Sequence, residues 1–82
     1  MTRFQVSSEP WGYVVEAYFP DTDGCERWQP LRNFGDRQGD AIDFRDIDCP
    51  ELGDANIKAL ISRYDRKTCY ARYKKNVYYK QH

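Results

Sequence analysis

Residues 54–79 read DANIKALISRYDRKTCYARYKKNVYY and join an amphipathic helical pattern to a basic, tyrosine-rich pattern. Four residues recur at the spacing i, i+3, i+4, i+7 of one helical face: Ile57, Leu60, Ile61 and Tyr64. Asp54 stands before this stripe, where its carboxylate can accept from unpaired backbone N–H groups as an N-cap. Arg63 lies at the other end, where a cation favours the helix dipole. We therefore predict a helix from Asp54 to about Tyr64 that packs on an apolar surface.

After Lys67 the pattern changes from helical spacing to alternation. Cys69, Ala71 and Tyr73 fall on one side of an extended chain, and tyrosine and threonine suit a half-buried strand. This alternation predicts a strand over about residues 67–73, then a turn and a short last strand or tail. The segment 74–76 either continues the strand or turns it back.

Three further strands are expected upstream, over residues 3–7, 11–19 and 25–29. The second has apolar residues on both faces, which is typical of a central strand. Residues 20–24 read PDTDG and favour a turn between the second and third strands. Pro30 cannot donate into a ladder and is expected to end the third strand or place it at an edge.

Residues 31–40 are rich in turn-forming residues and are expected to form a loop. In residues 41–48, Ile42 and Phe44 alternate with Asp43 and Arg45, which favours a fourth strand. A helix that begins at Pro50, with Asp48 as its cap, is an alternative start for the next element. The predicted fold is α+β: a small antiparallel sheet of about four to five strands with one short helix packed on one face, forming a single domain over residues 1–82.

Composition favours a folded protein in a reducing cytoplasm. The 82 residues include four Phe, two Trp and seven Tyr, too many aromatic residues for a disordered chain. No apolar run approaches the roughly 20 residues needed to cross a bilayer, and no signal peptide is recognised. Three cysteines are an odd number for a disulfide scaffold, so the thiols are expected to act as small buried apolar groups.

The net charge is zero, but the charges are unevenly distributed along the chain. Residues 1–62 hold six Lys or Arg against twelve Asp or Glu, a balance of −6. Residues 63–82 hold seven cations against one Asp, a balance of +6. Such polarity can drive association even when the total vanishes, although the two parts can also neutralise each other within the fold.

The sequence gives little support for catalysis, metal binding or cofactor binding. The only histidine, His82, is the last residue, where chain ends usually fray. The cysteines are 24 and 20 residues apart, unlike the close pairs of zinc sites. Gly35 and Gly39 match no phosphate-binding loop. We therefore expect a protein that is not an enzyme and needs no cofactor.

Two charged regions are the candidate binding sites. The first is acidic and would complement a basic surface on another protein; its residues are Asp36, Asp40, Asp43, Asp46, Asp48 and Glu51. The second is basic and aromatic and would suit single-stranded RNA or DNA, because cations neutralise phosphates and rings stack on bases; its residues are Tyr70, Arg72, Tyr73, Lys74 and Lys75. A homodimer is a third hypothesis, formed through an edge strand near Trp28 and Pro30 or through the final tyrosine-rich strand.

The acidic site is the leading hypothesis: a non-catalytic module that occupies a basic surface of a partner protein. In its small size, charge and lack of motifs, the chain resembles phage or mobile-element inhibitors of host machinery, such as anti-CRISPR proteins. This resemblance implies an inhibitor that binds a defence protein and blocks access to a basic groove.

Overall fold

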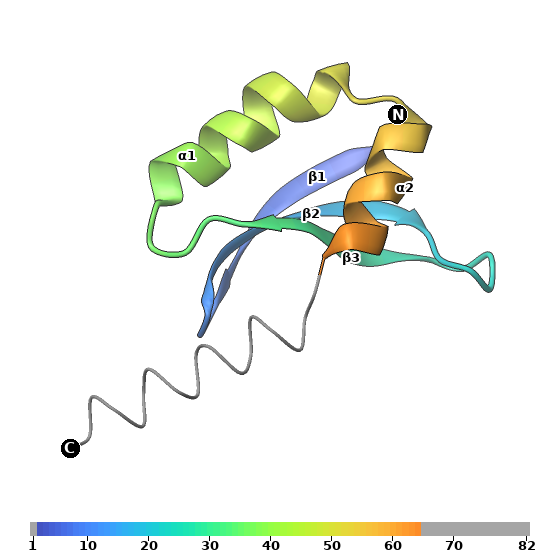
Figure 1. Cartoon of the computed structure of the whole chain (residues 1–82), viewed down its shortest axis with the longest axis horizontal. Coiled ribbons are helices and arrows are strands. Elements are labelled where there is room, and N and C mark those ends of the chain that lie inside the picture. Colours follow the sequence, from blue (N-terminus) through green and yellow to red (C-terminus); the bar gives the residue numbers. More distant parts are fainter. Residues whose placement is uncertain (1, 65–82) are drawn as a thin grey trace.

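The computed structural model describes residues 2–64, which form a three-stranded antiparallel sheet with helices on one face (Figure 1). The strands are β1 (Arg3–Glu9), β2 (Gly12–Pro20) and β3 (Glu26–Asn33), in the order β1-β2-β3. A continuous helical run of 14 residues follows; it consists of α1 (Gln38–Asp43), the π-helix η1 (Phe44–Asp48) and the 3₁₀ helix η2 (Cys49–Glu51). The last described element is α2 (Asp54–Arg63). The α+β class is therefore confirmed.

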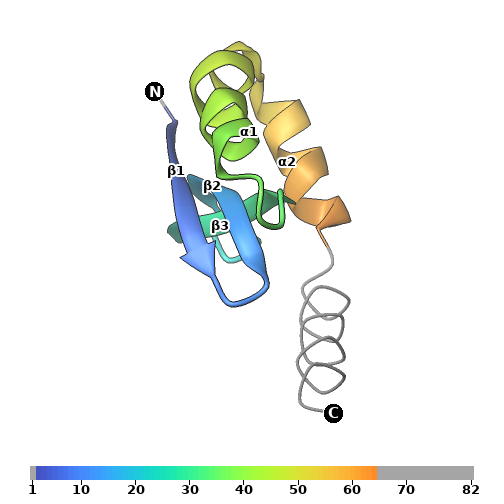
Figure 2. The same cartoon turned by 90° about the vertical axis from the view of Figure 1, so that its left-hand side faces the viewer.

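The central position predicted for the second strand is confirmed, because β2 pairs with both of its neighbours. Its alternate side chains separate the two faces of the sheet. Val15 and Ala17 are fully buried beneath the helices, with Phe4 and Val6 of β1 beside them. Glu16 and Tyr18 point to the other face, which we call the distal face because α1 and α2 both lie on the opposite side (Figure 2).

Of the two alternatives expected for Pro30, the edge position is confirmed: the third strand continues past Pro30 to Asn33 and lies at the edge of the sheet that residues 2–64 form. Pro30 lies opposite Glu16 and Arg32 opposite Val15, so one extra residue, Leu31, occupies a β-bulge between them. A bulge on an edge strand tolerates a residue without an N–H donor. Leu31 is buried in the core, so part of the predicted loop 31–40 is strand.

The predicted fourth strand over residues 41–48 is wrong, because this segment lies in the helical run 38–51. Ala41, Phe44 and Cys49 contact the core, at separations of three and five residues. A regular α-helix repeats every 3.6 residues, and the π-helix η1 absorbs the extra residue between Phe44 and Cys49. The run crosses β2 and β1, so two helical segments cover the sheet instead of the one expected.

The predicted helix over residues 54–64 is confirmed as α2, which packs beside β3 through Ile57, 1% exposed. Leu60 and Ile61 pack on the same core. Its N-cap is Gly53 and not Asp54, which is the first helical residue and places its negative charge in the first turn. The expected helix start at Pro50 corresponds only to the short η2 turn.

The turn predicted at residues 20–24 is confirmed. The Gly24 N–H donates to the Asp21 carbonyl at 2.9 Å, and Gly24 has a φ of +84°, which glycine adopts readily. The cysteine prediction holds for Cys49, which is fully buried, but is wrong for Cys25, which is exposed at this turn. Cys69 and the strands predicted after residue 66 lie outside the described residues.

Candidate functional site

The six acidic residues predicted to bind a partner are all exposed. Asp36 lies in the loop after β3, and the others project from the helical run; we call these six residues the acidic surface. Its backbone is held in place because Ala41 and Cys49, on the opposite side of the run, are completely buried against the sheet. The sequence patterns had predicted these residues on a strand and in loops, whereas five of the six lie on the helical run.

Only two of the six carboxylates have an ion-pair partner within residues 2–64. Arg37 Nη1 lies 3.3 Å from Asp40 Oδ2, and Arg45 Nε donates to Asp46 Oδ1 at 2.8 Å. The hydrogen bond from Arg45, strengthened by its charge, lowers the pKa of Asp46 below the usual aspartate value. Six carboxylates and two arginines leave a formal charge of −4 over residues 36–51, so this surface presents a net negative field to solvent.

An exposed apolar side chain lies among these charges. Ile47 is 65% exposed and is the only large hydrophobic residue among residues 2–64 that is this open to solvent. Asp46 and Asp48 flank it in the chain. In the alternation expected for residues 41–48, Ile47 falls on the side of Asp43 and Arg45, opposite Ile42 and Phe44; the structure exposes it on the helical run and not on a strand.

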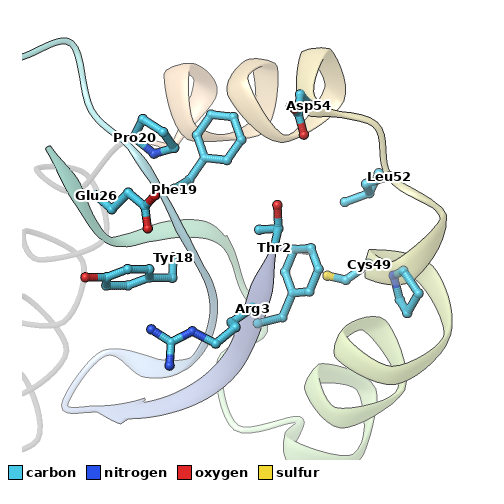
Figure 3. Close-up of a pocket in the computed structure, with 11 residues that line it drawn as sticks. Thr2, Arg3, Tyr18, Phe19, Pro20, Glu26, Cys49, Leu52 and Asp54 are labelled. Carbon is cyan, nitrogen blue, oxygen red and sulfur yellow. The ribbon is translucent and has the colours of Figure 1, made fainter. Parts of the chain in front are cut away.

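A cavity of about 610 Å³ lies between the first strand and the connection from η2 to α2 (Figure 3). Arg3, Tyr18 and Glu26 line one end, and Cys49 and Leu52 line the other. Burial, and secondarily the charge of Asp48, raises the pKa of the Cys49 thiol to about 11. The thiol is therefore protonated near neutral pH and is a poor nucleophile.

A second pocket, of about 480 Å³, opens on the distal face. It is lined by Glu9, Trp11, Val14, Glu16, Trp28, Pro30 and Tyr64. Sequence reasoning had missed it, since its residues come from four separate segments. The signal available was the alternation of β2, which places Val14 and Glu16 on the face opposite Val15.

The five residues predicted to bind nucleic acid, Tyr70 to Lys75, and His82 lie outside the described residues. Within residues 2–64, no group of three or more His, Cys, Asp or Glu side chains converges to hold a metal ion. No helix in this part of the chain is long and apolar enough to span a membrane.

No family model, curated protein or solved structure matches this chain. What the fold and the surface define is a small α+β module whose helical run carries exposed carboxylates and one exposed isoleucine.

Proposed function

We propose that this protein is a non-catalytic binding module that uses the acidic surface to occupy a basic, partly apolar surface of another protein. The observation that carries the proposal is the composition of the helical run 38–51: exposed carboxylates precede and follow the exposed Ile47 along the run.

The electrostatic part of the argument comes from carboxylates that this fold leaves without a cation. Asp36, Asp43, Asp48 and Glu51 have no ion pair within residues 2–64, so a partner's Lys or Arg gains their attraction without first breaking a pair. Complementary charge across an interface raises association rates and fixes register more than it raises affinity. Binding should therefore be faster at low ionic strength.

The apolar part comes from Ile47. Interfaces typically place a few apolar anchors in a desolvated centre and charged groups at a polar rim. Ile47, with Asp46 and Asp48 on either side, has this arrangement on a single helix. Its backbone is supported by the buried Cys49 two residues later, so little ordering entropy opposes binding.

Blocking of a basic groove follows from the same arrangement, because a rigid row of carboxylates competes with a nucleic acid for cationic side chains. We therefore favour an inhibitor of the phage or mobile-element anti-defence type, similar to anti-CRISPR proteins, acting in the cytoplasm. The supporting features are the size of the chain, its acidic helical layer and its odd number of cysteines.

The experiment is affinity capture with the full chain immobilised, using lysate of a bacterium that carries nucleic-acid-targeting defence systems. We expect a specific basic protein to be retained at low salt and released when the salt is raised severalfold. The variant Asp43→Lys, Asp46→Lys, Asp48→Lys should lose this protein while keeping the wild-type circular dichroism spectrum and melting temperature.

Two matched variants sharpen the comparison. Glu26→Lys changes an exposed carboxylate outside the acidic surface and should leave capture intact. Ile47→Ala should weaken capture by about tenfold, as expected for loss of an interface anchor. Capture that survives the triple reversal would refute the proposal.

A further inference from the structure

We propose that the pocket on the distal face, which we call the aromatic pocket, binds the cationic side chain of an Arg or Lys residue in an extended peptide of a partner protein. This inference is separate from the proposed function, because the aromatic pocket and the acidic surface lie on opposite sides of the sheet.

The pairing of the strands places the residues that line the pocket next to one another. Glu16 pairs with Pro30, and Tyr18 pairs with Trp28, so β2 and β3 contribute neighbouring side chains to the same face. Across β1, Ser7 pairs with Val14 and Glu9 with Gly12, which brings Glu9 to one end of this face. Trp11 enters from the turn between β1 and β2, and Tyr64 from the end of α2.

Three aromatic side chains and two carboxylates therefore line one hollow: Trp11, Trp28, Tyr64, Glu9 and Glu16. Val14, 2% exposed, and the buried Pro30 also line the pocket. A volume of about 480 Å³ falls within the range of about 300–1,000 Å³ that small-ligand pockets span. Rings that attract a cation by their quadrupoles, next to carboxylates, are the chemistry that recognises guanidinium and ammonium groups.

The carboxylates are positioned by neutral donors. Gln5 Nε2 donates to Glu16 Oε1 at 2.8 Å, and Ser7 Oγ donates to Glu9 Oε1 at 2.7 Å. Neither glutamate has an ion pair within residues 2–64, and each keeps a second oxygen for another donor. A ligand cation would supply the charge that neither Gln5 nor Ser7 provides, and charge-assisted hydrogen bonds are about twice as strong as neutral ones.

The same face already holds a cation against these rings. The Arg3 guanidinium lies 4.6 Å from the centre of the Tyr18 ring and 5.6 Å from that of Trp28. The two rings contact each other edge to face, with centroids 5.3 Å apart. Trp28 also lines the aromatic pocket, so a ligand cation would repeat a contact that this sheet makes with its own arginine.

The charge of the pocket decides against a nucleic-acid ligand. A strand of RNA or DNA could stack its bases on Trp11 and Trp28, but its phosphates would be repelled by Glu9 and Glu16. A peptide, in contrast, can place the cation of one Arg or Lys side chain in the pocket without bringing phosphates close to Glu9 and Glu16. Apolar neighbours of that cation, proline in particular, suit an aromatic-lined surface.

Trp11 and Trp28 are the only tryptophans of the chain, so intrinsic fluorescence reports on this pocket directly. The probe is the peptide acetyl-Ala-Pro-Arg-Pro-Ala-amide, titrated into the full chain. Its control replaces arginine by citrulline, which has the same shape without the charge. We expect a saturable change in tryptophan fluorescence with the arginine peptide, and an affinity for the citrulline peptide that is at least about fivefold weaker.

Two variants test the carboxylate. Glu16→Gln should weaken the affinity for the arginine peptide by about tenfold, as expected for loss of a charge-assisted hydrogen bond. Glu26→Gln, which removes an exposed carboxylate outside the pocket, should not change the affinity. Equal affinities for the two peptides, or an unchanged affinity in Glu16→Gln, would overturn the proposal.

Two other occupants would also overturn it. If the chain's own basic segment fills the pocket, the arginine peptide will bind only after Arg72, Lys74 and Lys75 are changed to Glu. If a second copy fills it, light scattering will show a dimer that Glu16→Gln dissociates. A monomer whose peptide affinity is unaffected by the three Glu substitutions supports a partner peptide.

Discussion

Replacing Gly12 by alanine should destabilise the fold by roughly 2–4 kcal/mol, because two separate loops meet at this glycine. Gly12 has a φ of +138°, where a side chain is strained at a cost of about 1–3 kcal/mol. A Cβ there would lie 2.7 Å from Gly35 Cα and 2.9 Å from Gly35 N, and would also collide with Asn33 Oδ1. The backbone of Gly35 cannot move aside by a rotamer change.

If the backbone shifts to relieve this collision, it will disturb the hydrogen bonds that join residues 11–13 to residues 33–35. Tyr13 N–H donates to the Gly35 carbonyl at 2.7 Å. The side chain of Asn33 joins the same two segments: its Nδ2 donates to the Trp11 carbonyl at 3.2 Å, and its Oδ1 accepts from the Gly35 N–H at 2.8 Å. Loss of one such bond adds about 1 kcal/mol. The same change should displace Trp11 and weaken peptide binding in the aromatic pocket.

Urea unfolding followed by circular dichroism measures the effect, with Gly39→Ala as the control. Gly39 lies in α1, has no positive φ, and has open space where the Cβ of an alanine would lie, with no atom within 4 Å. Alanine should leave the free energy of unfolding unchanged or raise it by up to about 1 kcal/mol. If the two variants have equal stability, the close approach at Gly12 is wrong.

Three further predictions use the same assay or a titration. Ile57→Ala should lower the free energy of unfolding by about 2–5 kcal/mol because it empties a core position, whereas Ile47→Ala should change it by less than about 0.5 kcal/mol; equal effects would contradict the assigned burial. The pKa of the Cys49 thiol is raised from 9.0 to about 11, so its contribution to stability is present below pH 9 and is lost as pH rises from 9 to 11. Cys49→Ala should reduce that part of the decline, and an identical pH profile would refute the linkage. The pKa of Asp23 should lie below the usual aspartate value, because its carboxylate accepts from the Cys25 backbone N–H and faces an arginine; a carbon-detected NMR titration with a midpoint at or above the usual value would contradict this.

The elements that were predicted correctly from the sequence have patterns that fit only one type of secondary structure. In β2, apolar residues occupy both faces over nine residues, which marks a central strand. In α2, the stripe that begins at Ile57 repeats at helical spacing and is followed by Arg63 at the end of the helix. The turn after Pro20 follows from local hydrogen bonding by aspartate and from glycine at a positive φ.

Residues 41–48 were misassigned because eight residues with four apolar side chains fit both the strand period and the helix period. Ile42 and Phe44 alternate as in a strand, yet Ala41, Phe44 and Cys49 are the residues that contact the core. Only the sheet surface beneath them selects the helical phase, since it buries Ala41 and Cys49 completely. The same selection turns Ile47 outward.

The candidate sites divide in a similar way. The carboxylates of the acidic surface could be found from composition, because aspartate and glutamate in a charged run are exposed in most folds. The aromatic pocket could not, because Trp11, Trp28 and Tyr64 are far apart in the chain and meet only through strand register and the direction in which α2 leaves the sheet.

Local patterns and composition were enough to predict the α+β class, the central strand, the α2 helix and the uneven distribution of charge. Each of these depends on interactions within a few residues or on the composition of a segment. The helical run over residues 38–51, and the pocket that three aromatic residues and two glutamates line, depend on tertiary packing. The physical reason is that burial against a distant surface outweighs weak local preference wherever the local pattern fits two structures.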